Sequence, residues 1–335
     1  MTLRIAINGF GRIGRMILRA LYESNYRQQV QIVAINDLSP IELSAHLLQF
    51  DSVHGAFKPS VAVDNQSLIV NNDRIAYHQV RDPAELPWSA EQVDVVFECT
   101  GRFTTREQAM AHIHAGAKKV VLSAPGKDVD ATVVFGVNDQ VLRAHDQIIS
   151  NASCTTNCLA PVAQVLHEAF GIERGMMTTI HAYTNDQSLC DGLHADPYRA
   201  RAAALSMIPT KTGAAQAVGL VLPELAGKLT GMAVRVPTSN VSLVDLTVQL
   251  SRTVTAEEVN QRMLAAAEQS PVLRCNPLPL VSCDFNGNPH SSIFDINHTI
   301  ANGDLLKVMA WYDNEWAFAN RMFDTCLALV NAPAA

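Results

Sequence analysis

The sequence lacks several features that would assign it to a specialised class of protein. Its 335 residues contain no internal repeat, no low-complexity tract and no apolar run near the roughly 18 residues of a membrane span. Charged Arg4 is followed at once by a strand-like run, so no leader is recognised and a cytoplasmic protein is expected. The formal net charge is -7, which argues against general electrostatic binding to nucleic acid or to an anionic membrane.

The seven cysteines show no regular spacing, and their odd number argues against a disulfide framework. Cys154 and Cys158 have no second Cys/His pair beside them, so no metal site is expected. They also lack the C-x-x-C spacing of a redox dithiol. An arbitrary cysteine is more often a buried, inert thiol than a reactive one. We expect this of six positions: Cys99, Cys158, Cys190, Cys275, Cys283 and Cys326.

The first half of the chain alternates between strand-like and helix-like segments. Apolar runs predict strands, and apolar residues at helical spacing predict the segments between them. Such alternation predicts a parallel sheet covered on both faces. The expected strands are Leu3–Asn8, Ile32–Asn36, Val93–Glu98, Val120–Leu122 and Thr132–Phe135, and the expected helices are Gly11–Glu23, Ile41–Phe50 and Arg106–Ala115.

A glycine-rich turn follows the first expected strand. It reads Gly9-Phe10-Gly11-Arg12-Ile13-Gly14, a G-x-G-x-x-G pattern that opens a helix within a βαβ unit. Gly9, Gly11 and Gly14 would allow a tight turn and a close approach of the backbone to a pyrophosphate. Asp37 ends the second strand and is placed to accept hydrogen bonds from a ribose 2′-hydroxyl. Its carboxylate would repel a 2′-phosphate, so the sequence predicts NAD rather than NADP.

The pattern changes after Ile149. A long helical segment runs from Ser153 to Phe170, and alternating apolar runs then predict a larger mixed or antiparallel sheet. We expect an α/β fold. A Rossmann-type doubly wound parallel sheet would form an NAD-binding domain at residues 1–150. An α+β catalytic domain would span 151–314, and a C-terminal helix in 315–335 would pack back on the first domain. The alternating runs are Met232–Val236, Ser242–Leu250 and Leu305–Tyr312.

Cys154 is the candidate nucleophile. It lies where the long helix should begin, in "SNASCTTNCLAP", among small polar residues that favour helix caps. A thiolate there should have a lowered pKa, more so beside an imidazole. His181 follows the apolar run Met176–Ile180, at a strand end that opens into a loop, where catalytic histidines are common. The chain has ten other histidines, so position alone does not select this one.

Several long motifs strongly resemble the phosphorylating glyceraldehyde-3-phosphate dehydrogenase family. They are "SNASCTTNCLAP", "TTIHAYTNDQ", "IPTKTGAA", "VLPELAGKLTGMAVRVPTSNVS" and "WYDNEWAFANRM", with "INGFGRIGR" and "SAPGKD" nearer the start. The resemblance covers essentially the whole chain. It implies oxidation of D-glyceraldehyde 3-phosphate, with NAD and inorganic phosphate, to 1,3-bisphosphoglycerate in glycolysis or gluconeogenesis. The reaction would pass through a cysteine thiohemiacetal and a thioester, in a homotetramer.

The same resemblance implies roles for individual residues. Cys154 would be the nucleophile and His181 its partner. The remaining cofactor residues would be Arg12, Ile13, Arg81, Ser123 and Asn314. The residues for the substrate phosphate and the attacking phosphate would be Ser153, Thr155, Thr184, Arg199, Thr212, Gly213 and Arg235. Hydroxyls and backbone N–H groups donate to phosphate oxygens, and guanidinium groups match them bidentately.

Two alternatives and two departures from the family pattern remain. Erythrose-4-phosphate dehydrogenase shares the Cys/His chemistry, but it typically alters the attacking-phosphate region that is intact here at Thr184, Thr212 and Gly213. A nucleotide-binding scaffold or regulator should have lost the nucleophile, the base or an anion-site arginine. One departure is Tyr198-Arg199, where many bacterial relatives have two adjacent arginines. The other is Gly192-Leu193, where many bacterial relatives have Leu-Pro near a neighbouring subunit's adenine ribose. This second departure makes strict selection of NAD less secure.

Overall fold

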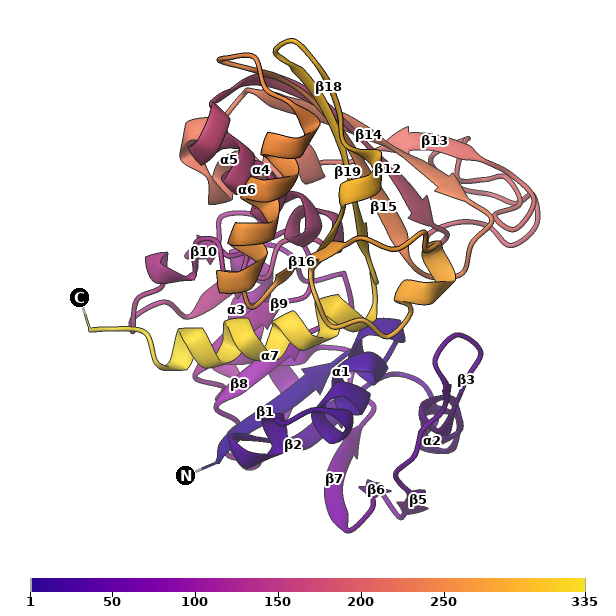
Figure 1. The fold of residues 1–335 in the computed structure, drawn as a ribbon. Coiled ribbons are helices and arrows are strands. Elements are labelled where there is room, and N and C mark those ends of the chain that lie inside the picture. Colours follow the sequence, from indigo (N-terminus) through magenta and orange to yellow (C-terminus); the bar gives the residue numbers. More distant parts are fainter. Residues whose placement is uncertain (1, 335) are drawn as a thin grey trace. The chain divides into compact units, whose positions relative to one another are not determined.

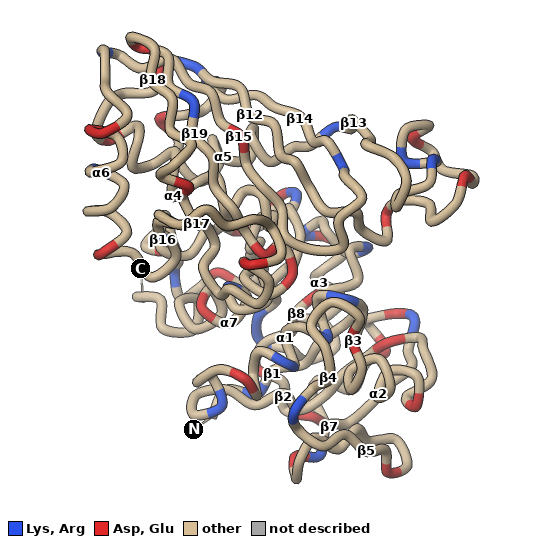
Figure 2. The backbone as a smooth tube through the Cα atoms, turned by 45° about the vertical axis from the view of Figure 1, so that its right-hand side comes forward, with Lys and Arg blue, Asp and Glu red and all other residues tan. Residues whose placement is uncertain are grey.

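A computed structural model describes residues Thr2–Ala334, and the chain divides into two compact units (Figure 1). Among the described residues, the first comprises 2–133, 139–152 and 319–334, and the second comprises Val134–Asn138 and Ser153–Phe318. Figure 2 shows acidic and basic positions interspersed along both units. Across the described residues, every helix is too short or too polar to cross a membrane.

The first unit is built on a nine-stranded sheet in the order β10-β11-β9-β8-β1-β2-β7-β6-β5. Every neighbouring pair from β10 to β7 is parallel, and the β7-β6-β5 edge is antiparallel. The strands are β1 (Leu3–Asn8), β2 (Val30–Asn36), β5 (Val61–Asp64), β6 (Ser67–Val70), β7 (Asp73–His78), β8 (Val95–Glu98), β9 (Lys119–Leu122), β10 (Ala131–Thr132) and β11 (Ile148–Ser150).

Burial on both faces explains why the central strands of this sheet are almost continuously apolar. All four residues of β8 are buried, as are the last four of β1. The connections between the strands carry α1 (Arg12–Glu23), α2 (Ile41–Gln49) and α3 (Arg106–His114), three 3₁₀ turns (Tyr26–Gln28, Pro83–Glu85, Asp139–Val141) and the small ribbon β3 (Phe50–Asp51) with β4 (Gly55–Ala56).

The strand order reverses between β1 and β8. The chain leaves β1 toward β2 on one side, and later places β8 on the other side of β1. Ligands of open α/β sheets bind outside the carboxyl ends of strands at such a point. Helix α7 (Trp316–Val330) ends the fold, and from Ala319 onward it belongs to the first unit. There Phe323 stacks on Tyr26, with 4.7 Å between ring centroids, and meets Phe97 edge-on.

The second unit contains an eight-stranded mixed sheet in the order β13-β14-β12-β15-β19-β17-β16, with β18 beside β19. The pairs β12–β14 and β16–β17 are parallel, and the other pairs are antiparallel. The strands are β12 (Ile172–Ala182), β13 (Ile208–Lys211), β14 (Leu229–Val236), β15 (Ser242–Leu250), β16 (Leu273–Asn276), β17 (Ser292–Asp295), β18 (Ile300–Asn302) and β19 (Leu305–Tyr312).

Three helices cover one face of this sheet (Figure 1). They are α4 (Cys154–Phe170), α5 (Ala214–Val221) and α6 (Ala256–Gln269), accompanied by 3₁₀ turns at Pro223–Leu225, Ser282–Phe285 and Ile296–His298. Strand β15 alternates strictly between buried and half-buried residues, as a sheet covered on one face requires. Its half-buried side chains lie on the face opposite the helices.

The two sheets confirm the predicted fold class, a doubly wound parallel sheet plus an α+β part with a large mixed sheet. The strand predicted at Thr132–Phe135 is shorter than expected, because only Ala131–Thr132 pairs with a neighbour. The antiparallel β5–β7 edge and helices α5 and α6 were not predicted. Strands β5 to β7 mix exposed and buried residues without the long apolar runs of the central strands.

Candidate active site

A cavity of about 630 Å³ lies in the first unit at the carboxyl ends of β1, β2 and β8. It is lined by predicted cofactor residues, among them Gly9, Gly11, Asp37 and Arg81. Gly9 has φ +94, and a Cβ there would come within 2.7 Å of the backbone nitrogen of Thr100. A Cβ on Gly14 would meet the carbonyl oxygen of Gly9 at 2.2 Å. Close packing therefore requires glycine at both positions.

Asp37 holds the glycine turn in place. One carboxylate oxygen accepts a hydrogen bond from the backbone N–H of Phe10 at 2.7 Å, and the other accepts from the N–H of Ser39 at 2.9 Å. Asp37 also borders the cavity. Its carboxylate thus fixes the backbone that a pyrophosphate would approach.

The remaining predicted cofactor residues lie elsewhere. Arg12, Ile13, Gly14 and Ser123 do not line this cavity, and Asn314 belongs to the second unit. The Arg12 guanidinium forms an ion pair with Asp51. Burial would raise the pKa of Asp51, but this partner and the backbone N–H groups of His54 and Val53 lower it to about 2.

Cys154 is the first residue of α4. Ser153 caps this helix, because its hydroxyl accepts from the backbone N–H of Thr156 at 3.0 Å. The chain enters the cap through Ala152, which is buried and has φ 55, a strained conformation for a residue with a side chain. The local backbone thus places the thiol at the positive end of the helix dipole.

His181 lies in β12, one residue before its end. Its Nε2 is 3.6 Å from the Sγ of Cys154. Its Nδ1 is 2.7 Å from the carbonyl oxygen of Ala182, which can only accept, so Nδ1 carries the proton. Nε2 therefore presents a lone pair to the thiol. Burial first, and Arg235 second, lower the pKa of His181 to about 3, so the ring is a neutral acceptor.

Arg235 stands beside His181 on the neighbouring parallel strand, β14. One guanidinium nitrogen donates to the carbonyl oxygen of Ala182 and to the hydroxyl of Thr184, each at 3.1 Å. Its Nε is buried and has no hydrogen-bond partner among the described residues. An arginine with a buried, unsatisfied N–H is a donor available to an anion.

The expected lowering of the pKa of Cys154 is wrong for this structure. Burial raises the pKa of the Cys154 thiol, while the positive charge of Arg235 and hydrogen bonds from Thr155 oppose the rise. His181 is neutral and contributes no positive charge of its own. Both shifts favour a neutral thiol facing a neutral imidazole.

Tyr312 is a site residue that the sequence argument missed. Its hydroxyl lies 2.8 Å from the hydroxyl of Thr155 and 2.9 Å from that of Thr179, and its ring meets His181 edge-on with centroids 6.0 Å apart. It fixes the inner surface behind the thiol and the imidazole. The run Leu305–Tyr312 alternates along the sequence, and Tyr312 ends it at one of the positions that the structure buries. That alternation was the signal that could have identified Tyr312.

Comparison with known proteins decides the family. Two family models match: "Glyceraldehyde 3-phosphate dehydrogenase, NAD binding domain" at residues 3–106, and "Glyceraldehyde 3-phosphate dehydrogenase, C-terminal domain" at residues 153–314. A glyceraldehyde-3-phosphate dehydrogenase of Pseudomonas aeruginosa is 66% identical over 332 residues, covering 99% of both chains. A chromosomal one of Cupriavidus necator is 60% identical over 335 residues, covering 99% of this chain and 100% of its own.

The chain belongs to the glyceraldehyde-3-phosphate dehydrogenase family. Similarity extends to more distant bacteria: glyceraldehyde-3-phosphate dehydrogenase 1 of Bacillus subtilis is 53% identical over 328 residues, covering 97% of each chain.

The residues predicted to bind anions fall into two groups. One surrounds Arg235 and Thr184, beside His181. The other surrounds Arg199, which donates to the hydroxyl of Thr210 at 2.9 Å and forms ion pairs with Asp186 and Asp196.

The hydroxyls of the other predicted anion residues are engaged within the protein. The Thr155 hydroxyl bonds Tyr312, and the Ser153 hydroxyl caps α4. The Thr212 hydroxyl accepts from the N–H of Ala214, at the start of α5, and Gly213 caps that helix. Backbone N–H groups at the starts of both helices are the donors these segments offer.

Asn314 is oriented by its own hydrogen bond. Its Oδ1 accepts from the hydroxyl of Ser242 at 2.8 Å, and that hydroxyl accepts from the backbone N–H of Ala182 at 3.0 Å. The Nδ2 end of Asn314 is therefore the end that can donate. One buried serine thus joins the end of β12, the strand that carries His181, to the amide predicted to bind the cofactor.

The other cysteines differ partly from expectation. Cys158 and Cys326 are buried, and burial raises the pKa of Cys158 to about 12. Cys190 and Cys283 are exposed, so the expectation of burial is wrong for both. Each lies in a segment rich in polar residues that sequence periodicity did not resolve. Within Thr2–Ala334, His, Cys, Asp and Glu form no cluster of three or more that could hold a metal ion.

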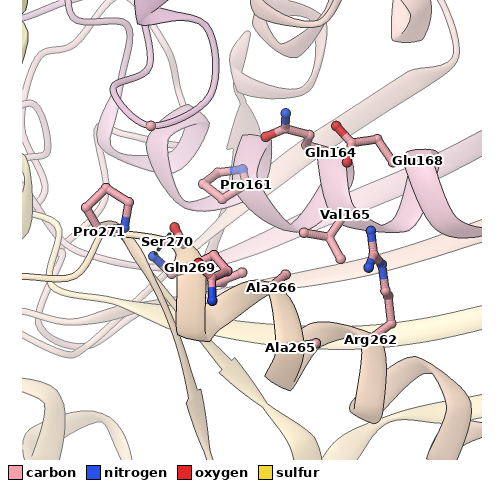
Figure 3. Close-up of a pocket in the computed structure, with 12 residues that line it drawn as sticks. Pro161, Gln164, Val165, Glu168, Arg262, Ala265, Ala266, Gln269, Ser270 and Pro271 are labelled. Carbon is pink, nitrogen blue, oxygen red and sulfur yellow. Dashed lines mark hydrogen bonds between the residues drawn. The ribbon is translucent and has the colours of Figure 1, made fainter.

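A second hollow, of about 320 Å³, lies between α4 and α6 (Figure 3). Gln164 and Glu168 from α4 and Arg262 and Gln269 from α6 line it, together with apolar side chains such as Val165. None of the predicted site residues borders this hollow, so it is separate from the thiol–imidazole pair.

Proposed function

We propose that this chain catalyses the phosphorylating oxidation of D-glyceraldehyde 3-phosphate, with NAD and inorganic phosphate, to 1,3-bisphosphoglycerate. The observation that carries the proposal is the Cys154–His181 pair, in which a thiol at a helix N-terminus faces a lone pair on neutral Nε2. Relatives that are 66% and 60% identical and are named glyceraldehyde-3-phosphate dehydrogenase support the same activity. It is an aldehyde oxidoreductase of glycolysis or gluconeogenesis.

The first step captures the aldehyde. The Cys154 sulfur attacks the carbonyl carbon, and its proton passes to Nε2 of His181 and on to the carbonyl oxygen, which gives a thiohemiacetal. Arg235 stabilises negative charge on sulfur during attack, because it already opposes the rise in the thiol pKa. The backbone N–H of Cys154 stabilises negative charge on the oxygen. His181 returns to its neutral form.

The second step oxidises the thiohemiacetal. His181 removes the hydroxyl proton as the C–H bond yields its hydrogen with both electrons, which leaves a thioester on Cys154. NAD bound to the protein supplies the acceptor for that hydride. Inorganic phosphate then attacks the thioester carbon, the carbon–sulfur bond breaks, and the acyl phosphate leaves. The thiolate recovers a proton from His181.

NAD is the cofactor that fits the first-unit cavity. The glycine turn allows close approach of a pyrophosphate, and Asp37 and Arg81 border the same space. We assign Gly9, Gly11, Arg12, Ile13, Gly14 and Ser123 to the phosphate side, and Asn314 to the nicotinamide amide through its Nδ2. Asp37 would meet the 2′-phosphate of NADP with a negative charge, so NAD is preferred.

Two anion sites serve the substrate phosphate and the attacking phosphate. Arg235 with Thr184 forms one group and Arg199 the other, and the N-termini of α4 and α5 add backbone donors. Asp186 and Asp196 neutralise Arg199 in this state. Phosphate binding there has to compete with those carboxylates. The residues we assign to these sites are Ser153, Thr155, Thr184, Arg199, Thr212, Gly213 and Arg235.

The functional division follows the two sheets. We assign cofactor binding to residues 1–150 with the C-terminal segment 315–335, and catalysis to residues 151–314. The enzyme acts in the cytoplasm as a homotetramer. Exposed apolar side chains support self-association, because Leu205 is 85%, Met207 76% and Met176 73% exposed. A monomeric mass in light scattering at micromolar concentration would contradict the tetramer.

A steady-state assay tests the activity directly. Purified enzyme is given glyceraldehyde 3-phosphate or erythrose 4-phosphate, with and without phosphate, and with NAD or NADP. We expect phosphate-dependent NADH formation with the first aldehyde. Faster, phosphate-independent turnover of erythrose 4-phosphate would replace this proposal by the sister activity.

A further inference from the structure

A buried carboxylate lies beneath the first-unit cavity without lining it. Glu98, the last residue of β8, is 2% exposed and is absent from the cavity wall. Its Oε1 accepts from the backbone N–H of Thr100 at 2.8 Å and from the Thr100 hydroxyl. Its Oε2 is 2.6 Å from Nδ2 of Asn8 and 3.0 Å from Nε2 of His112.

Two arms of hydrogen bonds converge on this carboxylate. In one, the indole N–H of Trp88 donates to Nδ1 of His112 at 3.0 Å, so His112 carries its proton on Nε2 and donates to Glu98. In the other, Asn36 donates through Nδ2 to Oδ1 of Asn8 at 2.7 Å, and Asn8 donates to Glu98.

The second arm begins at a backbone group. The N–H of Val80 donates to Oδ1 of Asn36 at 2.9 Å, which fixes the orientation of that amide and then of Asn8. Asn8 and Asn36 end the adjacent strands β1 and β2, and Val80 follows β7. The network therefore crosses the carboxyl edge of β8, β1, β2 and β7. Its members Asn8, Asn36, Val80 and Thr100 line the cavity.

We propose that Glu98 is the positioning residue of the dinucleotide cavity. Both arms begin at groups that can only donate, the indole of Trp88 and the backbone N–H of Val80. The donor-to-acceptor direction of the hydrogen bonds cannot be reversed in either arm. The residue where the two arms meet must therefore accept hydrogen bonds from both and donate none. An ionised carboxylate meets this condition, and charge-assisted bonds to it hold both amides and the imidazole in one orientation.

The position of Thr100 connects this network to the glycine turn. A Cβ on Gly9 would come within 2.9 Å of the Cα of Thr100 and even closer to its nitrogen. The glycine turn and the backbone at Thr100 are therefore in close contact, with no room for a side chain between them. Glu98 holds the Thr100 peptide against that turn, and the Thr100 hydroxyl in turn accepts from the N–H of Arg102. Displacing Thr100 would alter the cavity wall at the point where a pyrophosphate approaches.

Glu98→Gln is the sharpest perturbation, because it replaces one oxygen by an NH₂ group of similar size. If the new amide keeps its oxygen toward Thr100, its NH₂ faces the donors of Asn8 and His112. Rotating the side-chain amides of Asn8 and Asn36 by 180° would leave the NH₂ of Asn36 facing the N–H of Val80, which is also a donor. Moving the His112 proton to Nδ1 would leave that N–H facing the indole N–H of Trp88. A buried donor stays unsatisfied in every arrangement.

The inference rests on the proposed binding of NAD in this cavity, and the experiment keeps the two apart. NAD affinity is measured by calorimetry on the full chain, with steady-state kinetics and the alkylation rate of Cys154 alongside. For Glu98→Gln we expect the Kd and KM of NAD to rise at least about tenfold, which corresponds to ~1.4 kcal/mol. The KM of the aldehyde and the alkylation rate should stay within about twofold of wild type. Failure of the wild type to bind NAD would refute the proposed function itself.

The matched control is Glu107→Gln, an exposed glutamate on the same helix as His112, which should leave NAD binding unchanged. A second pair of variants guards against misfolding of Glu98→Gln. His112→Gln keeps a donor for Glu98 and should bind NAD nearly as wild type, whereas His112→Leu removes one arm and should weaken binding several-fold. In ¹⁵N-Trp-labelled protein, the Trp88 indole signal should shift in Glu98→Gln and His112→Leu and stay in place in Glu107→Gln. NAD affinity within twofold of wild type in both Glu98→Gln and His112→Leu would overturn the proposal.

Discussion

The buried, neutral state of His181 makes folding stability depend on pH. Burial, and then the charge of Arg235, lower the pKa of His181 from 6.5 to about 3, while its hydrogen bond to Ala182 acts in the other direction. Between these two pKa values the unfolded chain binds a proton that the folded chain does not. The contribution of His181 to stability is therefore complete above pH 6.5 and falls progressively as the pH drops toward 3.

The magnitude follows from proton linkage. One proton of difference changes the unfolding free energy by ~1.4 kcal/mol per pH unit, so lowering the pH from 7 to 5 should cost about 2 kcal/mol through this residue alone. In His181→Gln that titration is lost. The unfolding free energy of wild type minus that of His181→Gln should therefore be about 2 kcal/mol lower at pH 5 than at pH 7.

Urea unfolding at pH 7 and pH 5 measures this shift. Wild type, His181→Gln and the control His114→Gln, an exposed histidine, are compared at one protein concentration, because self-association changes apparent stability. The control should follow the wild type at both pH values. An identical pH dependence in wild type and His181→Gln would show that the imidazole is not held neutral, and would refute the assignment of Nε2 as a lone-pair acceptor.

Three further changes test separate parts of the site. His181→Asn should slow hydride transfer by about 10²–10⁴ in stopped-flow absorbance, the usual scale of acid–base assistance, and should slow alkylation of the active-site thiol; unchanged rates would remove the histidine from the mechanism. Wild type should prefer NAD over NADP by at least about tenfold in kcat/KM, and Asp37→Ala should narrow that gap; equal use of both cofactors by the wild type would contradict the role of the carboxylate. Tyr312→Phe removes the hydroxyl that joins two threonines and should lower the unfolding free energy by about 1–2 kcal/mol in urea; unchanged stability would show that these contacts contribute little.

Much of the first unit could be predicted from the sequence because its signals are local. A Cβ at Gly9 or Gly14 would collide with neighbouring backbone, so both positions require glycine. This requirement is visible in the sequence as the G-x-G-x-x-G motif. The buried central strands likewise appear as continuous apolar runs. Strands β5 to β7 escaped prediction because an antiparallel edge is partly solvated and its pattern is mixed.

The candidate site was predictable in its residue types but not in its electrostatics. Cys154 at a helix start and His181 near a strand end were found from sequence and family resemblance, and the structure brings them to 3.6 Å. The register that sets Arg235 beside His181 joins residues 54 positions apart and has no local signal. The direction of the thiol pKa was mispredicted because burial outweighs the opposing effects of Arg235 and of the hydrogen bonds from Thr155, and depth of burial is a property of the folded chain.

The network around Glu98 shows a similar limit. Each member is a common polar residue at or near a strand end, and only the order of the strands brings Asn8, Asn36 and Glu98 into one line. Donor and acceptor directions then follow from the two fixed ends. Sequence alone offered no reason to separate Glu98 from any other acidic residue.

We expect oxidation of the aldehyde to leave the acyl group on Cys154. Enzyme mixed with glyceraldehyde 3-phosphate and NAD in the absence of phosphate, quenched in acid within one turnover, is analysed by intact mass and peptide mapping. We expect one acyl group per chain, located on Cys154, absent from Cys154→Ser and discharged when phosphate is added before the quench. NADH formed without an adduct at Cys154, or with the acyl group on another residue, would contradict it.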